Sequence, residues 1–133
     1  MTNKVKIFDS LKSEKDIELV YRKGKVIIST DRIIKANYLS ADNLTNRIKF
    51  AITVSSKTGN SVWRNRFKRI IRESLRLELA SLKKINFKSN SDLLIIFSPY
   101  KINQTNNKQL FLKDIKPALS DILNKLRTTS RPE

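Results

Sequence analysis

The side chains with the most distinctive chemistry lie between positions 55 and 76. This stretch of 22 residues carries seven basic residues and a single acidic one, Glu73. The basic residues are Lys57, Arg64, Arg66, Lys68, Arg69, Arg72 and Arg76. A guanidinium keeps its charge at physiological pH and can donate two parallel hydrogen bonds to a phosphate. Solvated helix faces usually mix charges of both signs, so this one-sided pattern indicates a surface that binds phosphates.

A helix that begins at Ser61 gathers most of these side chains on one side. On a wheel at about 100° per residue, an arc of roughly 140° holds Arg64, Asn65, Lys68, Arg69, Arg72 and Arg76, with Arg66 at its margin. The opposite arc, roughly 120° wide, holds Trp63, Phe67, Ile70, Ile71 and Leu77. We expect this apolar arc to face the core. Asn65 can hydrogen-bond a base edge, a 2′-hydroxyl or a phosphate, although an ordinary solvated position accounts for it equally well.

The composition excludes several kinds of active site. The chain has no cysteine, which rules out disulfides, thiol nucleophiles and cysteine-based zinc sites. It has no histidine, which rules out a Ser-His-Asp triad and a histidine metal site. Its two glycines, Gly24 and Gly59, are too few for either glycine-rich phosphate-binding motif.

The overall charge indicates a polyanionic partner. The chain has 133 residues, a size typical of one domain, and a net charge of +16 at pH 7. Nucleic acid is favoured over an anionic membrane surface. The longest apolar run, Leu93–Phe97, is far shorter than the ~20 residues of a membrane-spanning helix. Because the first residues also lack the apolar segment of a signal peptide, we expect a cytoplasmic protein with no membrane partner.

The pattern of the whole chain predicts a single α+β domain over residues 1–133, with a core of about 11–127 and loose termini. Helices are predicted at 11–22, 61–84 and about 111–127, and strands at 25–30, 32–39, 47–55 and 92–98. The order α-β-β-β-α-β-α contains a strand–helix–strand unit. This order favours a single mixed four-stranded sheet with helices packed on it.

Several boundaries carry local signals. Ser13 is expected to cap the first helix and Gly24 to end it. Asn60 or Ser61 is expected to cap the long basic helix. Pro117 interrupts the last helical pattern, so that helix either begins just before Pro117 or kinks there.

Residues 55–76 read Ser55-Ser-Lys-Thr-Gly-Asn-Ser-Val-Trp-Arg-Asn-Arg-Phe-Lys-Arg-Ile-Ile-Arg-Glu-Ser-Leu-Arg76. This run resembles the signature of the bacterial ribonuclease P protein subunit, K-x-G-x-A-V-x-R-N-R-x-K-R-x-x-R-E. It departs mildly at Ser56, where Lys is commoner, and at Ser61, where Ala is usual. The resemblance covers about residues 11–127, including the first helix with its following Gly24-Lys25 and the leucine-rich last helix.

The resemblance implies a fold and a function. The family fold has the predicted element order, with a left-handed crossover through the Arg-rich helix, where general rules favour a right-handed one. The chain would be the accessory protein subunit of ribonuclease P, an endoribonuclease that removes the 5′ leader from precursor tRNA. In this family the RNA subunit holds the Mg²⁺ ions and performs the hydrolysis, so the protein needs no catalytic residue and no cofactor. Its implied partners are the ribonuclease P RNA, bound one-to-one by a monomeric protein, and the precursor tRNA leader.

The resemblance also implies roles for individual residues. The residues that match the RNA-facing motif, its preceding loop and its continuation are Lys57, Asn60, Arg64, Asn65, Arg66, Lys68, Arg69, Arg72 and Arg76. A second surface of the family, a cleft between the first helix and the sheet, holds the single-stranded leader by base stacking on aromatic rings. Tyr21 matches one aromatic residue there, whereas Ile17 stands where Phe is common. Either Asn37 or Tyr38 occupies the aromatic position of the second strand, and ordinary packing explains Tyr21 and Tyr38 equally well.

Other functional classes stay open. A ribosomal or other structural RNA-binding protein fits the charge and composition equally well. A stand-alone nuclease needs clustered carboxylates to hold metal ions. The candidate carboxylates are far apart in sequence: Asp31, Asp42, Glu73, Asp92 and Asp114. No helix-turn-helix partner precedes the basic helix, which favours structured RNA over a DNA groove.

Overall fold

The computed structural model of the chain describes residues 9–42, 48–78 and 91–129. Its helices are α1 (Glu14–Lys23), α2 (Ser61–Leu77) and α4 (Leu112–Thr129). Its strands are β1 (Asp9–Ser10), β2 (Lys25–Ile28), β3 (Ile34–Asp42), β4 (Ile48–Ile52) and β5 (Ser91–Pro99). Residues 1–8, 43–47, 79–90 and 130–133 lie outside the described residues. Of the termini predicted to be loose, on either side of a core of about 11–127, Asp9–Ser10 instead form β1, and α4 continues to Thr129.

The described strands form one mixed sheet in the order β1-β4-β5-β3-β2. β3 is antiparallel to both β2 and β5, whereas β4 is parallel to β5 and to β1. The α+β class and the four predicted strands are confirmed, and the two-residue β1 is an addition. The chain passes from β4 through α2 to the adjacent parallel β5. The left hand expected for this crossover stays a prediction.

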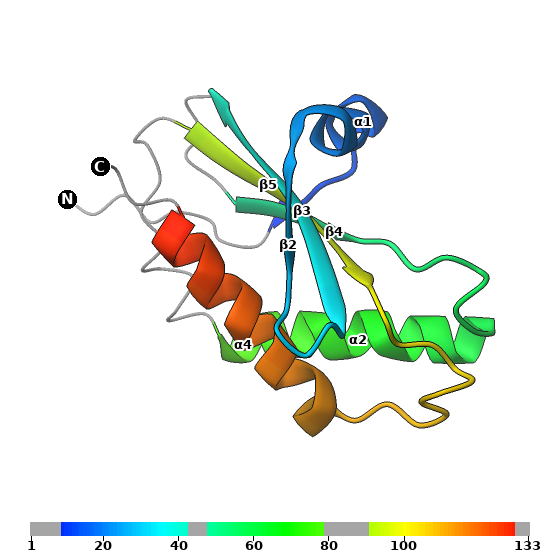
Figure 1. The fold of residues 1–133 in the computed structure, drawn as a ribbon. Coiled ribbons are helices and arrows are strands. Elements are labelled where there is room, and N and C mark those ends of the chain that lie inside the picture. Colours follow the sequence, from blue (N-terminus) through cyan, green and yellow to red (C-terminus); the bar gives the residue numbers. More distant parts are fainter. Residues whose placement is uncertain (1–8, 43–47, 79–90, 130–133) are drawn as a thin grey trace.

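Helices cover the two faces of the sheet unequally. α2 and α4 lie together on one face, and α1 lies on the other (Figure 1). The larger core is between the sheet and the α2–α4 pair, where Phe67, Phe97 and Leu119 are fully buried. A smaller apolar cluster lies under α1 and includes Val20 and Ile96. Alternate residues of each strand therefore serve different cores.

α1 has the predicted cap and the predicted end. The Asp16 amide donates a hydrogen bond of 3.3 Å to the Ser13 hydroxyl, and Gly24 is the C-cap residue. The helix begins at Glu14 rather than at Leu11. Leu11 instead donates a 2.8 Å backbone hydrogen bond to the Phe50 carbonyl and is 4% exposed. Pairing with β4 therefore places Leu11 in the core without a helix.

α2 begins as predicted but ends earlier. The Asn60 side chain accepts a hydrogen bond of 2.9 Å from the Trp63 amide. The helix ends at Leu77, whereas the pattern predicted a helix to Lys84. Glu78 is not helical, so the prediction is wrong there, and residues 79–84 lie outside the described residues. Glu78 leaves the helical conformation and contacts α4 through Ser120 and Lys116. Leu77, predicted to be buried, is 51% exposed because it stands at this end.

α4 runs through its proline. It begins at Leu112, which confirms the predicted start near residue 111 and rules out the alternative start just before Pro117. Pro117 cannot donate a hydrogen bond to the carbonyl of Lys113, but Lys113 is exposed and its carbonyl lies in the first turns of the helix. The predicted apolar stripe is confirmed, with Ile115 and Ile122 fully buried. Within the described residues, no helix is long and apolar enough to cross a membrane.

Candidate nucleic-acid interface

The outer face of α2 carries the predicted basic side chains. The side chains exposed along it are Asn65, Arg66, Arg69, Arg72 and Arg76. Arg64 and Lys68 are half-buried at one edge, because the apolar arc that includes Leu75 turns toward the sheet beside them. The exposed arc is therefore rotated from the predicted one, and Arg66 belongs to it rather than to its margin. We refer to these seven residues, Arg64 to Arg76, as the α2 face.

Some side chains of the α2 face are held by the protein. The Arg64 Nε donates a 3.1 Å hydrogen bond to the Gly59 carbonyl. The Arg66 Nε donates one of 2.6 Å to the Leu110 carbonyl. Arg76 lies 3.6 Å from Glu73, an exposed pair that contributes little to stability.

The other side chains of the α2 face have no such partner. Among the described residues, none forms a hydrogen bond or ion pair with the side chains of Asn65, Lys68, Arg69 or Arg72. The buried residues Phe67 and Ile71 anchor α2, the helix that carries these four side chains. The result is a row of cationic groups on a fixed helix, open to an anionic ligand.

The start of α2 is tied to the loop between β5 and α4, residues 100–111. The backbone amide of Gln104 donates a 2.7 Å hydrogen bond to the Thr58 carbonyl. The side-chain oxygen of Gln104 accepts one of 2.9 Å from the backbone amide of Asn60. The Trp63 indole donates a 2.8 Å hydrogen bond to the Asn107 carbonyl. These bonds hold the loop and the cap of α2 in one arrangement. The sequence motif includes Asn60 but gives no sign of its partner, Gln104.

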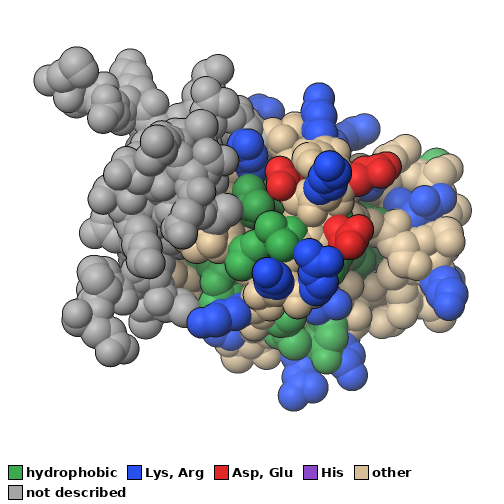
Figure 2. Space-filling view, turned by 90° about the horizontal axis from the view of Figure 1, so that it is seen from above, with side chains coloured by type: hydrophobic (Ala, Val, Ile, Leu, Met, Phe, Trp, Pro, Cys, Tyr) green, Lys and Arg blue, Asp and Glu red, His purple; other side chains and the backbone are tan. Residues whose placement is uncertain are grey.

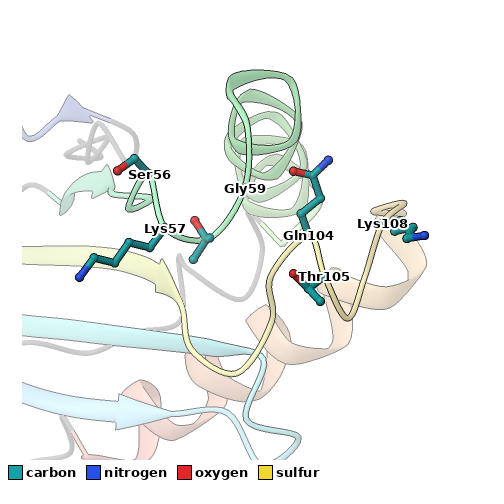
Figure 3. A pocket seen from close by; sticks show the side chains of 7 residues that line it. Ser56, Lys57, Gly59, Gln104, Thr105 and Lys108 are labelled. Atoms are coloured by element: carbon teal, nitrogen blue, oxygen red, sulfur yellow. The ribbon is translucent and has the colours of Figure 1, made fainter.

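A cavity of about 470 Å³ lies where these two segments meet (Figure 3). Lys57 and Lys108 line it together with the polar residues Thr58, Gln104 and Thr105. In Figure 3 the two lysine side chains point away from each other. Lys57 belongs to the turn that leads into α2.

The sheet surface on the α1 side holds three of the four predicted leader-binding positions. Asn37 pairs with Ile96, and both belong to the strand positions that face α1 together with Ile17. Tyr21 is 47% exposed, and its hydroxyl lies 3.2 Å from that of Thr53. We refer to Ile17, Tyr21 and Asn37 as the α1 face.

Tyr38 lies on the opposite side of the sheet. It pairs with Ile95 and packs against the core under α2 and α4. The register therefore separates the two alternatives that the sequence leaves open: Asn37 is the second-strand residue on the α1 face, and Tyr38 is not. Successive residues of a strand point to opposite faces, so both cannot lie there.

Asn37 has an unusual environment. Asn37 is 7% exposed, and its Oδ1 atom is buried without a hydrogen-bond partner among the described residues. Such an atom is costly to the fold. Figure 2, viewed from the α1 side, shows hydrophobic side chains in a strip, with Lys and Arg side chains as well as Asp or Glu side chains around it.

A family comparison decides the class of the protein. The model of the Ribonuclease P family matches residues 6–123. The chain belongs to the ribonuclease P protein family. Two relatives are similar over most of their length. The ribonuclease P protein component of Alkaliphilus metalliredigens is 36% identical over 123 residues, 92% of this chain and 96% of that protein. The component from Staphylococcus carnosus is 30% identical over 113 residues, 85% of each chain.

Solved ribonuclease P proteins have the same fold. The protein from Thermotoga maritima matches with a TM-score of 0.65 at 20% identity, covering 88% of this chain and 96% of that one. The Staphylococcus aureus protein matches with a TM-score of 0.60 at 22% identity, covering 92% and 97%. The predicted α+β architecture is thus the fold of known ribonuclease P proteins.

Family membership gives the general function. The chain is a ribonuclease P protein component, the protein part of an endoribonuclease, and an RNA-binding protein of tRNA 5′ processing. Proteins of this family function with the ribonuclease P RNA. Within the described residues, no three acidic side chains are grouped so that they could hold a metal ion.

Proposed function

We propose that the chain binds the ribonuclease P RNA through the α2 face and thereby aids removal of the 5′ leader from precursor tRNA. The observation that carries this proposal is the row of exposed cations on α2, of which Arg69 and Arg72 have no partner among the described residues. Such guanidiniums bind backbone phosphates and replace counterions. Asn65 on the same face supplies a hydrogen bond to a base edge or a 2′-hydroxyl.

The proposed mechanism is electrostatic. Two polyanions, the ribonuclease P RNA and the precursor tRNA, repel each other, and a protein of charge +16 between them lowers that repulsion. The RNA holds the Mg²⁺ ions and carries out the hydrolysis, and one monomeric protein binds one RNA. Less free Mg²⁺ is then needed, because the cations of the protein replace part of the screening.

The α1 face is proposed to hold the single-stranded leader. Tyr21 offers a partly exposed ring on which a base can stack, and Asn37 is the second-strand residue of the same surface. Ile17 supplies apolar contact in place of a ring. Stacking tolerates any base, so this surface binds leaders of many sequences.

The salt dependence of RNA binding tests the role of the α2 face. In Arg69→Ala and Arg72→Ala, binding of a bacterial ribonuclease P RNA weakens, and the slope of log affinity against log salt falls by about 0.7–0.9 for each lost phosphate contact. The measurement is a filter-binding titration at several salt concentrations. Lys12→Ala, which removes one charge from an exposed side chain ahead of α1, is the matched control and keeps the wild-type slope.

Equal slopes for the wild type and both arginine variants overturn the assignment of the α2 face. Binding to ribosomes with no effect on precursor tRNA cleavage points instead to a structural RNA-binding protein. Circular dichroism of each variant checks that α2 is intact. The variants are expected to fold normally, because neither arginine has a partner among the described residues.

A further inference from the structure

An exposed aromatic ring lies next to the α2 face. Phe111, just before α4, is a large apolar residue but is 42% exposed. Two cations flank its ring: the Arg66 guanidinium carbon is 5.9 Å and the Lys113 ammonium 5.7 Å from the ring centroid. Both cations lie over the ring within cation–π distance, and the residue is still partly exposed to solvent.

The ring and the arginine are held in place together. The Arg66 Nε donates its 2.6 Å hydrogen bond to the carbonyl of Leu110, the residue directly before Phe111. The Leu110 side chain is 1% exposed, so it anchors this point of the chain in the core. Arg66 is thereby fixed beside Phe111, with its terminal nitrogens still available to a ligand.

The charge around the ring matches RNA. Arg66 and Arg69 continue from the ring onto the α2 face, and both are exposed. The acidic residue nearest to Phe111 in sequence is Asp114, which is exposed. The one nearest to Arg69 is Glu73, which lies 3.6 Å from Arg76. A partly exposed aromatic ring beside a held guanidinium and a second cation suits an unpaired nucleotide, which can stack its base on the ring and pair its phosphates with the cations.

We propose that Phe111 is a stacking platform for an unpaired base of the ribonuclease P RNA, with Arg66 and Lys113 on the flanking phosphates. The inference rests on the proposed function, because it extends the α2 face across Arg66 to the start of α4. The occupant is the ribonuclease P RNA rather than the leader, since α1 and the α1 face lie on the opposite side of the sheet (Figure 1).

Substitutions at Phe111 separate stacking from packing. Phe111→Ala and Phe111→Leu weaken binding of a bacterial ribonuclease P RNA about fivefold or more, because neither side chain has a π face. Phe111→Trp binds as the wild type does. Val26→Ala, at an apolar β2 position that is 52% exposed on the α1 side of the sheet, is the control and leaves affinity unchanged. Wild-type affinity in Phe111→Leu overturns the proposal, since an apolar contact then suffices.

Fluorescence of Phe111→Trp reports stacking directly. The natural Trp63 is 3% exposed and gives a constant background that the wild type measures. Addition of the ribonuclease P RNA alone quenches the new tryptophan. Quenching that appears only after precursor tRNA is added, or no quenching at all, overturns the proposal. If the wild type fails to bind the RNA, or Arg69→Ala binds as tightly as the wild type, the proposed function fails first. If Arg69→Ala weakens binding but the Phe111 substitutions do not, only the stacking role of Phe111 is overturned.

Discussion

Arginines of the α2 face differ in how their guanidiniums are held. Arg64 and Arg66 each donate one hydrogen bond to a backbone carbonyl, which fixes their direction. Arg69 and Arg72 are exposed and have no partner among the described residues, so their side chains can adapt to phosphates. Fixed and adaptable cations together suit a folded RNA, where some phosphates have set positions and others vary. The type of residue alone does not reveal this division, because it depends on the carbonyls of Gly59 and Leu110.

Substitutions at Tyr21 test whether the α1 face binds the leader. Tyr21→Ala removes the ring and lowers the preference of the holoenzyme for precursor over mature tRNA about fivefold or more, the range for loss of one stacked base. Tyr21→Phe keeps the ring and loses only the contact between its hydroxyl and Thr53, so most of the preference remains. Binding titrations with both tRNAs make the comparison. The stacking role is wrong if the two variants behave alike.

At the scale of elements, α1 is set on the sheet by close packing at its C-terminal end. A Cβ atom at Gly24 would lie 2.6 Å from the Tyr38 carbonyl oxygen and closer still to that of Val20. Both are backbone atoms and cannot move separately from β3 and α1. The angle of α1, and with it the position of Tyr21, thus depends on a residue without a side chain.

Gly24→Ala is therefore expected to destabilise the fold by about 1–3 kcal/mol, the usual cost of forcing an extra group into a packed site. Urea denaturation gives the difference. Gly59→Ala is the matched comparison, because its nearest neighbours are side-chain atoms of Gln104 and Trp63 at 3.0 Å, which can give way at lower cost. A Gly24→Ala protein as stable as the wild type would contradict this account of the contact.

α4 is joined to the turn between β2 and β3 by Asp121. Burial alone would raise the pKa of this carboxyl, but hydrogen bonds from the Thr30 amide (2.7 Å) and hydroxyl (2.9 Å) and the Lys125 ammonium at 3.3 Å lower it below its ordinary value. A lowered pKa in the folded state means that the charged form stabilises the fold. That contribution is fully present above the unfolded-state pKa near 3.8 and is lost as the pH falls through the folded-state value.

Asp121→Asn should consequently destabilise the protein by about 1 kcal/mol near pH 7, a hydrogen-bonded charge discounted for its partial exposure. The difference from the wild type should shrink as the pH falls through the folded-state pKa, which lies below 3.8. Thermal or urea unfolding at neutral pH and over this acidic range measures it. A difference that stays constant with pH would mean that the charge of Asp121 has no part in joining α4 to the turn.

Element positions that depend on local pattern were predictable. The Asn60 cap, the buried Trp63 and Phe67 and the apolar stripe of α4 follow from spacing along the chain. Features that depend on distant partners were not. β1 exists only through its pairing with β4, and α2 ends where Glu78 meets α4.

The residues of the candidate site likewise fall into those that the sequence could predict and those that it could not. The residues of the α2 face could be named from the sequence, because a motif and a helical period mark them. The choice between Asn37 and Tyr38 needed the register of β3 against β5. Phe111 was missed, since its exposure and its contact with Arg66 depend on how the 100–111 loop docks on α2.

For the whole molecule, the charge of +16 is arranged on a fold that presents separate surfaces on the two sides of one sheet. α2 with α4 covers one side and α1 the other (Figure 1). Under the proposed function, such a protein contacts two nucleic acids at once, the ribonuclease P RNA through α2 and the leader through the α1 face. Neither proposed contact requires a catalytic group in the protein, because the RNA is proposed to carry out the hydrolysis.

The most direct test of this central claim is cleavage of a 5′-labelled precursor tRNA at low Mg²⁺ by the protein mixed with a bacterial ribonuclease P RNA. The account predicts release of the 5′ leader only when both macromolecules are present, and cleavage by the RNA alone once Mg²⁺ is raised. Cleavage by the protein without RNA would contradict the assignment of hydrolysis to the RNA. No cleavage at low Mg²⁺ with an RNA that is active at high Mg²⁺ would contradict the role of the protein as its subunit.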